Sequence, residues 1–241
     1  MRTRDLDLRA HFVTDDRVPF ADLVAIVADV VAAGIPVVQL RDKTVSDAEV
    51  LERATRLADV MAGGTSILLI DDRVDVALEA RRRGVRIDGV HLGQSDMNPR
   101  RARSVLGDDA VIGWTANTDE HFAEAGRKPR GTLDYLGVGV IRATATKPDH
   151  PAPLGIDGFR ALAATSALPC VAIGGVGIDD IEALTDPSPD RIGRPAAGVA
   201  VVSALSAAPD PAAAARAIMA ALPRRDTSAW RDAPARSGAS A

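Results

Sequence analysis

The sequence is poor in cysteine, in aromatic residues and in long apolar runs. Its single cysteine, Cys170, excludes an internal disulfide and fits a reducing compartment. Aromatic residues make up 3% of the chain and the net charge is −4, which argues against a nucleic-acid binder. No apolar run reaches the ~18 residues of a membrane span, and no apolar secretion segment follows the first residues. We expect a cytoplasmic protein that binds neither membranes nor nucleic acid.

The chain does contain a regular alternation of short apolar runs and helical patterns. Nearly all-apolar strands that alternate with helices indicate a parallel sheet covered on both faces. Eight such units favour a single (β/α)8 TIM barrel over residues 1–222. The alternative, an open doubly wound sheet, would be expected to carry a GxGxxG motif after its first strand, and that motif is missing. The expected strands are residues 10–13, 36–40, 67–70, 89–92, 110–114, 134–140, 169–173 and 197–203.

Three segments depart from this regular pattern. Residues 141–155 form a long loop without periodicity, a feature that is usually functional or disordered. Residues 185–195 contain three prolines, which indicates an inserted surface loop. Residues 223–241 are polar and rich in small residues, and we expect a flexible C-terminal tail.

Polar side chains gather where the expected strands end. Functional residues of such barrels come from these C-terminal ends, whereas the opposite ends here carry mainly glycine and proline turns. This asymmetry predicts a site at the C-terminal mouth. The polar and glycine residues in question are Asp15, Gln39, Arg41, Lys43, Asp71, Asp72, His91, Gln94, Asp96, Thr115, Thr144, Thr146, Lys147, Gly174, Gly175 and Ser203.

Two carboxylates follow neighbouring strands of the expected barrel. Asp72 follows the third strand and Asp96 the fourth, so they should lie close together. Paired carboxylates at such a rim suit Mg²⁺ that also binds substrate phosphates. Taken alone, Asp72 could equally cap the helix that begins at Arg73, and Asp96 could be a solvated loop residue.

Phosphate groups are the expected ligands of the other rim residues. The glycine pair Gly174–Gly175 and Ser203 follow strands seven and eight, where barrels commonly bind a monophosphate. Arg41, Lys43 and Lys147 would hold a second phosphate group together with the Mg²⁺. The simpler interpretations are a tight turn, a charged strand end and a surface lysine. These patterns predict an enzyme that binds phosphates, without naming its reaction.

Two further side chains within apolar strands are interpreted as core residues. His91 lies inside the fourth strand, where a hydrogen-bonded core histidine is the favoured interpretation over a catalyst. Cys170 lies inside the seventh strand and also reads as core.

Several motifs together resemble one family, the thiamine phosphate synthases (thiamine-phosphate pyrophosphorylases). They occur in family order and at family spacing over about residues 10–221. The combination of QLRDK, HLGQSD and TATK is specific, although AIGG alone is weak. The matching pieces are FVTD, VVQLRDK, LLIDDRVDVAL, DGVHLGQSDM, IGWTANT, DYLGVGVIRATATK, VAIGGV and GVAVVSAL.

The resemblance implies a transferase reaction with Mg²⁺ as cofactor. An aminopyrimidine with a diphosphate on its methylene group is joined to a thiazole monophosphate, which gives thiamine phosphate and pyrophosphate. The family mechanism is dissociative: pyrophosphate departs first, and the thiazole nitrogen captures the resulting pyrimidine cation. Such a reaction needs charge neutralisation and positioning more than a general base. The absence of a Ser-His-Asp or Cys-His pattern is then expected.

The resemblance also implies roles for individual residues. The pyrimidine diphosphate would be bound by Gln39, Leu40, Arg41, Asp42, Lys43 and Lys147. Asp71 and Thr115 are also expected to bind substrate. The thiazole substrate would meet Thr144, Ala145 and Thr146, with its phosphate on Gly175, Val202 and Ser203. Asp72 and Asp96 would hold Mg²⁺. The expected catalytic residues are Arg41, Lys43, Lys147 and Thr115.

The chain departs from the family pattern at five positions. Asp71 replaces the usual asparagine, Thr115 a common serine, Arg142 a common aromatic, and Ala143 and Ala145 common prolines. Asp71 adds negative charge beside a diphosphate. We hypothesise that Asp71 assists Mg²⁺ binding while Arg142 offsets charge nearby.

Other functions remain compatible with the same barrel. A relative resembling a thiazole tautomerase would share the phosphate loops but would not need the Asp72–Asp96 pair together with the three cations. A non-catalytic ligand-binding barrel is disfavoured by the full set of charged rim residues. The alanine- and valine-rich helix faces leave a homo-oligomer open.

Overall fold

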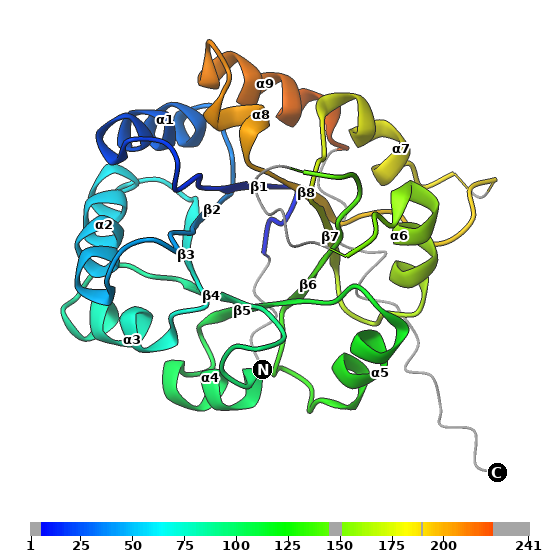
Figure 1. The fold of residues 1–241 in the computed structure, drawn as a ribbon, viewed down its shortest axis with the longest axis horizontal. Helices are drawn as coiled ribbons and strands as arrows, with labels where there is room; N and C mark the ends of the chain where they lie inside the picture. The colour runs from blue at the N-terminus through cyan, green and yellow to red at the C-terminus, as the bar shows by residue number, and fades with distance from the viewer. Residues whose placement is uncertain (1–5, 145–150, 189, 224–241) are drawn as a thin grey trace.

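The computed structural model of the chain describes residues 6–144, 151–188 and 190–223 (Figure 1). Within them, eight parallel strands close into a barrel in sequence order, with β1 paired to both β2 and β8. The (β/α)8 barrel predicted from the sequence is therefore confirmed, and the open sheet is excluded. The strands are β1 Ala10–Val13, β2 Val37–Leu40, β3 Ile67–Asp71, β4 Gly89–Leu92, β5 Val111–Thr115, β6 Tyr135–Val138, β7 Cys170–Ile173 and β8 Gly198–Val201.

Helices surround the barrel on its outer side (Figure 1). None of the helices in the described ranges is long and apolar enough to cross a membrane. They are α1 Phe20–Ala32, α2 Asp47–Val60, α3 Val74–Arg82, α4 Pro99–Leu106, α5 Asp119–Arg127, α6 Gly155–Ala164, the 3₁₀ turn η1 Ile178–Asp180, α7 Ile181–Thr185, α8 Ser203–Ser206 and α9 Pro211–Ala221.

Three helices begin at a serine, an asparagine or an aspartate, residue types that commonly cap helices. The Ser46 side chain accepts a hydrogen bond from the backbone N–H of Glu49 at the start of α2. Asn98 caps α4 in the same way, and Pro99 occupies the first turn. Asp210 caps α9. Each cap satisfies an N–H group that the helix itself leaves without a partner.

The end of the barrel differs in detail from the prediction. Thr185 belongs to α7, where its buried hydroxyl donates to the backbone oxygen of Ile181 at 2.7 Å, so the inserted loop begins at Asp186. The short helix α8 directly after β8 was not predicted. In the predicted tail, Pro223 is described and residues 224–241 lie outside the described residues.

The core has two layers because side chains alternate along each strand. Outward-facing residues pack against the helices, among them Phe12, Leu40 and Ile70. Inward-facing residues such as Leu69 and Tyr135 fill the barrel itself. At the C-terminal ends of β2 to β5, the inward positions carry polar side chains: Gln39, Asp71, His91 and Thr115.

Two glycines make room for the large rings inside the barrel. A Cβ atom at Gly113 would lie 2.5 Å from His91 Nδ1, and one at Gly137 would lie 2.8 Å from His91 Cε1. Both distances are shorter than real Cβ contacts. The sequence therefore accommodates His91 and Tyr135 by leaving two positions on β5 and β6 without side chains.

Candidate functional site

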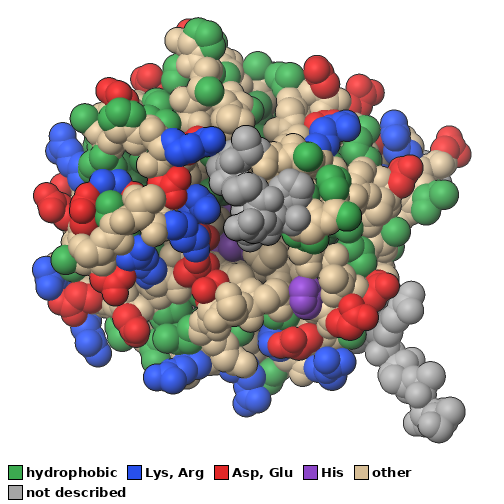
Figure 2. Space-filling view, in the orientation of Figure 1, with side chains coloured by type: hydrophobic (Ala, Val, Ile, Leu, Met, Phe, Trp, Pro, Cys, Tyr) green, Lys and Arg blue, Asp and Glu red, His purple; other side chains and the backbone are tan. Residues whose placement is uncertain are grey.

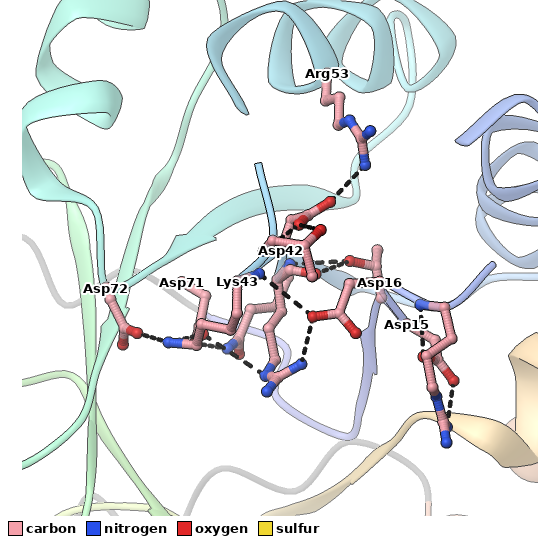
Figure 3. A network of polar contacts seen from close by, with 12 residues as sticks. Asp15, Asp16, Asp42, Lys43, Arg53, Asp71 and Asp72 are labelled. Carbon is pink, nitrogen blue, oxygen red and sulfur yellow. Dashed lines mark hydrogen bonds and ion pairs between the residues drawn. The ribbon is translucent and has the colours of Figure 1, made fainter. Parts of the chain in front are cut away.

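Basic and acidic side chains gather at the mouth beside β2 and β3 (Figure 2). Lys43 Nζ lies 3.2 Å from Asp71 Oδ2 and also donates to the carboxylate of Asp72 (Figure 3). Gln39 Nε2 donates to Asp71 Oδ1 at 2.6 Å, and Arg41 Nε lies 3.9 Å from Asp71 Oδ2. The structure thus brings these five predicted site residues together in one cluster.

Asp16 also belongs to this cluster, although it is not among the residues predicted from the sequence. Its Oδ2 lies 3.3 Å from Arg41 Nη1 and accepts a hydrogen bond from the backbone N–H of Lys43. The neighbouring Asp15, which was named at the rim, pairs with Arg17 instead. Both carboxylates follow β1, and the sequence did not distinguish which of them faces β2.

Asp42 lies within the predicted binding segment but is bonded to its own loop. Its Oδ1 accepts hydrogen bonds from the backbone and hydroxyl of Thr44, and its Oδ2 pairs with Arg53 of α2. Burial opposes the charged form, but these bonds and the Arg53 charge outweigh it and lower the pKa of Asp42. The carboxylate fastens the loop after β2 to α2, and the neighbouring Leu40 packs in the outer core.

Asp72 and Asp96 belong to loops that follow neighbouring strands. Asp72 has a φ of 60°, uncommon for a residue other than glycine, and its N–H donates to the His91 oxygen at 2.8 Å. The helix after it has Arg73 as its N-cap and no side-chain capping bond, so the capping interpretation of Asp72 is wrong. Asp96 Oδ2 accepts a hydrogen bond from Gly93 N at 2.7 Å, two residues beyond His91.

Two carboxylates could supply only part of the coordination shell of a hard cation. Among the described residues, no group of three or more His, Cys, Asp or Glu side chains is arranged to bind a metal ion. Mg²⁺ is commonly held by one or two carboxylates, with substrate phosphates and water completing its shell. Asp72 and Asp96 are carboxylates from adjacent loops, which is the ligand type that Mg²⁺ takes, and their binding of the ion stays a prediction.

His91 connects the mouth with the barrel interior. It is 7% exposed, its Nδ1 lies 2.9 Å from the Tyr135 hydroxyl, and its Nε2 lies 3.1 Å from the Thr115 hydroxyl. Its interpretation as a hydrogen-bonded core histidine is confirmed. Tyr135 was not singled out, because a tyrosine within an apolar strand gives no sign of its hydrogen-bond partner.

The predicted phosphate loop at Gly174 and Gly175 has a backbone conformation that favours glycine at both positions. Gly174 and Gly175 have φ values of 88° and 66°, and a Cβ at Gly175 would lie 2.8 Å from the Arg142 oxygen. The segment after β6 therefore packs closely on this turn. Val202 and Ser203 follow the adjacent strand β8, and Ser203 is the first residue of α8.

Arg142 has a partner other than the one hypothesised. Its guanidinium donates to the carboxylate of Asp180, with Nε lying 3.1 Å from Oδ1. This hydrogen bond lowers the pKa of Asp180. The groups that contact Asp71 are instead Gln39, Arg41 and Lys43, so the hypothesis that Arg142 offsets the charge near Asp71 is wrong. Of the remaining predicted residues, Thr144 is half-buried after β6, and Ala145, Thr146 and Lys147 lie outside the described residues.

The fold and this rim define a class of protein: a (β/α)8 barrel enzyme whose C-terminal mouth carries cations, carboxylates and a glycine turn. The family model for thiamine monophosphate synthase matches residues 10–205. The chain belongs to this family and, with it, to the transferases.

Individual relatives agree with this assignment. The chain is 40% identical over 213 residues to a thiamine-phosphate synthase of Azorhizobium caulinodans, covering 88% of this chain and 93% of the relative. It is likewise 40% identical over 213 residues to a thiamine-phosphate synthase of Corynebacterium efficiens, covering 88% and 94%.

Solved structures also resemble the chain. A thiamine phosphate pyrophosphorylase from Pyrococcus furiosus has a TM-score of 0.74 at 27% identity, over 90% of this chain and 96% of that one. A 3-hexulose-6-phosphate synthase has a TM-score of 0.63 at 17% identity, over 90% and 100%, and this likeness concerns the fold alone.

Proposed function

We propose that the chain is a thiamine phosphate synthase. It joins 4-amino-2-methyl-5-(diphosphooxymethyl)pyrimidine to 4-methyl-5-(2-phosphooxyethyl)thiazole and releases pyrophosphate in the presence of Mg²⁺. The observation that carries the proposal is the cluster in which Arg41 and Lys43 lie against Asp16, Asp71 and Asp72 at the mouth of a barrel of this family.

The first step breaks the bond between the pyrimidine methylene carbon and the diphosphate oxygen. The electron pair of that bond leaves with pyrophosphate, so negative charge grows on the departing group. Arg41 and Lys43 are already oriented by carboxylates, and preorganised cations stabilise such charge at little reorganisation cost. Lys147, from the loop after β6, is proposed to add a third cation.

Asp72 and Asp96 are proposed to hold Mg²⁺. The ion would act as a Lewis acid that withdraws charge from the diphosphate oxygens. Since Lys43 contacts Asp72 in the structure, we infer that substrate binding transfers this lysine from the carboxylate to the diphosphate.

The second step forms a bond between the thiazole nitrogen and the pyrimidine methylene carbon, using the nitrogen lone pair. No proton has to be removed, which agrees with a mouth built from cations and carboxylates. The protein's contribution is to hold the two reactants together. Thr144, Ala145 and Thr146 are proposed to meet the thiazole, and Gly175, Val202 and Ser203 to seat its phosphate.

The alternative of a thiazole tautomerase-like enzyme needs proton transfer and no leaving pyrophosphate. Such an enzyme has no use for Arg41 and Lys43 arranged around paired carboxylates, so the cluster favours the synthase. A ligand-binding barrel without activity is disfavoured for the same reason.

The experiment is to incubate the protein with both substrates and Mg²⁺, then oxidise the product to its fluorescent derivative. Thiamine phosphate should accumulate with Mg²⁺ and cease to form when EDTA removes the metal. No thiamine phosphate under either condition would refute the proposed function, and unchanged formation with EDTA would refute the role of Mg²⁺.

A further inference from the structure

A buried chain of three side chains runs from the interior of the barrel to its mouth. It crosses three strands, from Tyr135 on β6 through His91 on β4 to Thr115 on β5. Tyr135 is 1% exposed, and Thr115 lies at the partly open end of β5. A neutral histidine ring has one donor nitrogen and one acceptor nitrogen, so the direction of the His91–Tyr135 bond determines the direction of the His91–Thr115 bond.

The Tyr135 hydroxyl determines the donor–acceptor direction of these hydrogen bonds. Burial raises the pKa of Tyr135, so the phenol keeps its proton and has an O–H group that needs an acceptor. Among the described residues, the hydrogen-bond partner of this hydroxyl is His91 Nδ1. The other ring nearby, His11, contacts Tyr135 edge-on, and its buried Nε2 has no hydrogen-bond partner, so it does not accept this proton.

The opposite direction would leave a buried donor unsatisfied. If His91 Nδ1 carried the proton, it would donate to the tyrosine oxygen, and the Tyr135 O–H would have no acceptor among these residues. A buried polar group without a partner costs about 1–3 kcal/mol. The favoured arrangement has Tyr135 donating to Nδ1 and His91 Nε2–H donating to the Thr115 oxygen.

The arrangement has a consequence for Thr115. A hydroxyl that accepts from His91 Nε2–H has its own proton available for another acceptor. We propose that Tyr135 and His91 are positioning residues that make the Thr115 hydroxyl a hydrogen-bond donor toward an oxygen of the pyrimidine diphosphate. The inference rests on the proposed function, because the diphosphate is the acceptor.

The direction of these hydrogen bonds matters most in the transition state for pyrophosphate departure. The diphosphate oxygens gain negative charge as pyrophosphate departs, so a donor aimed at them binds more strongly in the transition state than in the ground state. A threonine that presented a lone pair instead would repel the same charge. These hydrogen bonds are therefore expected to affect kcat rather than the KM of either substrate.

A double-mutant cycle on kcat tests the coupling. Tyr135→Phe should lower kcat about fivefold to tenfold with little change in KM, since the direction of the chain is no longer fixed. Thr115→Val keeps the side-chain shape without the hydroxyl. Adding Tyr135→Phe to Thr115→Val should change kcat by less than about twofold, because the hydroxyl on which the tyrosine acts is already absent.

A matched control is Thr185→Val, which removes a buried threonine hydroxyl in α7 that bonds to Ile181. In that background, Tyr135→Phe should keep its full effect. If Tyr135→Phe lowered kcat by the same factor with and without the Thr115 hydroxyl, Tyr135 would act through packing and the proposal would be wrong.

A second measurement needs neither activity nor a stable variant. In the wild-type protein with ¹⁵N-labelled histidine, NMR distinguishes the two neutral tautomers of a ring. His91 should carry its proton on Nε2, and a proton on Nδ1 would overturn the proposal. Absence of turnover in the wild-type enzyme would refute the proposed function and leave this tautomer measurement to decide the direction of the chain.

Discussion

At the scale of single residues, Asp71 is the carboxylate around which polar side chains of the mouth gather. The resemblance noted in the sequence implies an asparagine at this position, beside the proposed diphosphate site. The structure shows how this charge is accommodated, because Gln39 donates to one oxygen and Lys43 and Arg41 lie near the other. Asp71 thus orients Lys43 and Arg41, while its charge would oppose the proposed diphosphate substrate.

Asp71→Asn should separate these two effects. The half-saturating concentration of Mg²⁺ should rise several-fold because a nearby negative charge is lost, and the KM for the pyrimidine diphosphate should fall for the same reason. Steady-state kinetics at varied Mg²⁺ measures both. Asp16→Asn is the matched control: it also removes a carboxylate near Arg41 and Lys43, but on the side of β1, and should leave the Mg²⁺ dependence unchanged. Unchanged kinetics in Asp71→Asn would contradict this account.

The sequence was informative about residues wherever position along a strand determined their direction. Gln39, Arg41 and Lys43 alternate at the end of β2, and Asp71 ends β3, so their gathering could be predicted. Asp16 and Tyr135 could not, because choosing between adjacent carboxylates, or finding the partner of a buried hydroxyl, requires the three-dimensional packing. Arg142 shows the same limit: Asp180 lies 38 residues away in the chain.

At the scale of elements, the inserted loop after α7 is anchored by a buried arginine. Arg160 of α6 is 1% exposed, and its guanidinium donates to the backbone oxygens of Asp186 and Ile192, each at 3.0 Å. Gly193 lies against the Arg160 backbone with a φ of 82°, a conformation that favours glycine. The loop is thus fastened to α6 in the outer helix layer.

Arg160→Met should therefore destabilise the protein without altering its chemistry. Removing the buried guanidinium takes a charged donor from the partly buried carbonyl oxygens of Asp186 and Ile192, at a cost of about 1.5–3 kcal/mol. For a chain of this length, Tm should fall by about 5–10 °C in a thermal melt.

The control for this prediction is Arg191→Met in the same loop. Arg191 forms an exposed pair with Asp186 at 2.9 Å, and such surface pairs contribute about 0–1 kcal/mol. Its Tm should change by less than about 3 °C. Equal changes in the two variants would show that burial of Arg160 does not matter.

Strands with clear apolar runs and long, capped helices could be predicted from the sequence better than short helices. The helices capped by Ser46, Asn98 and Asp210 and the eight apolar strands follow from local patterns. The helical segment that begins at Ile178 also follows from the sequence, but its C-terminal end and the four-residue α8 are too short to show periodicity, so tertiary packing decides them. The boundary error at Thr185 has this cause.

At the scale of the whole molecule, the two ends of the barrel differ in their charged side chains. At the mouth, charges from three loops converge around Asp71. At the opposite end, a cleft of about 780 Å³ is lined by Asp7, Arg9, Arg86 and Asp88, whose charges are paired locally. The parallel, closed topology produces this division, because it directs all strand C-termini to one face. The regular alternation of strands and helices in the sequence predicts this division for the same reason.

The most direct test of the proposed function compares the loss of one basic side chain at the mouth with the loss of one at the base of the barrel. Thiamine phosphate and pyrophosphate are quantified in the same reaction for the wild-type enzyme, Lys43→Met and Arg86→Met. Arg86 bonds to the backbone oxygens of Gly64 and Ser66 at the base, so it controls for loss of a structural cation. The account predicts equal amounts of both products, a loss of more than about tenfold in kcat/KM for Lys43→Met, and an unchanged value for Arg86→Met. Unequal products, or equal loss in both variants, would contradict it.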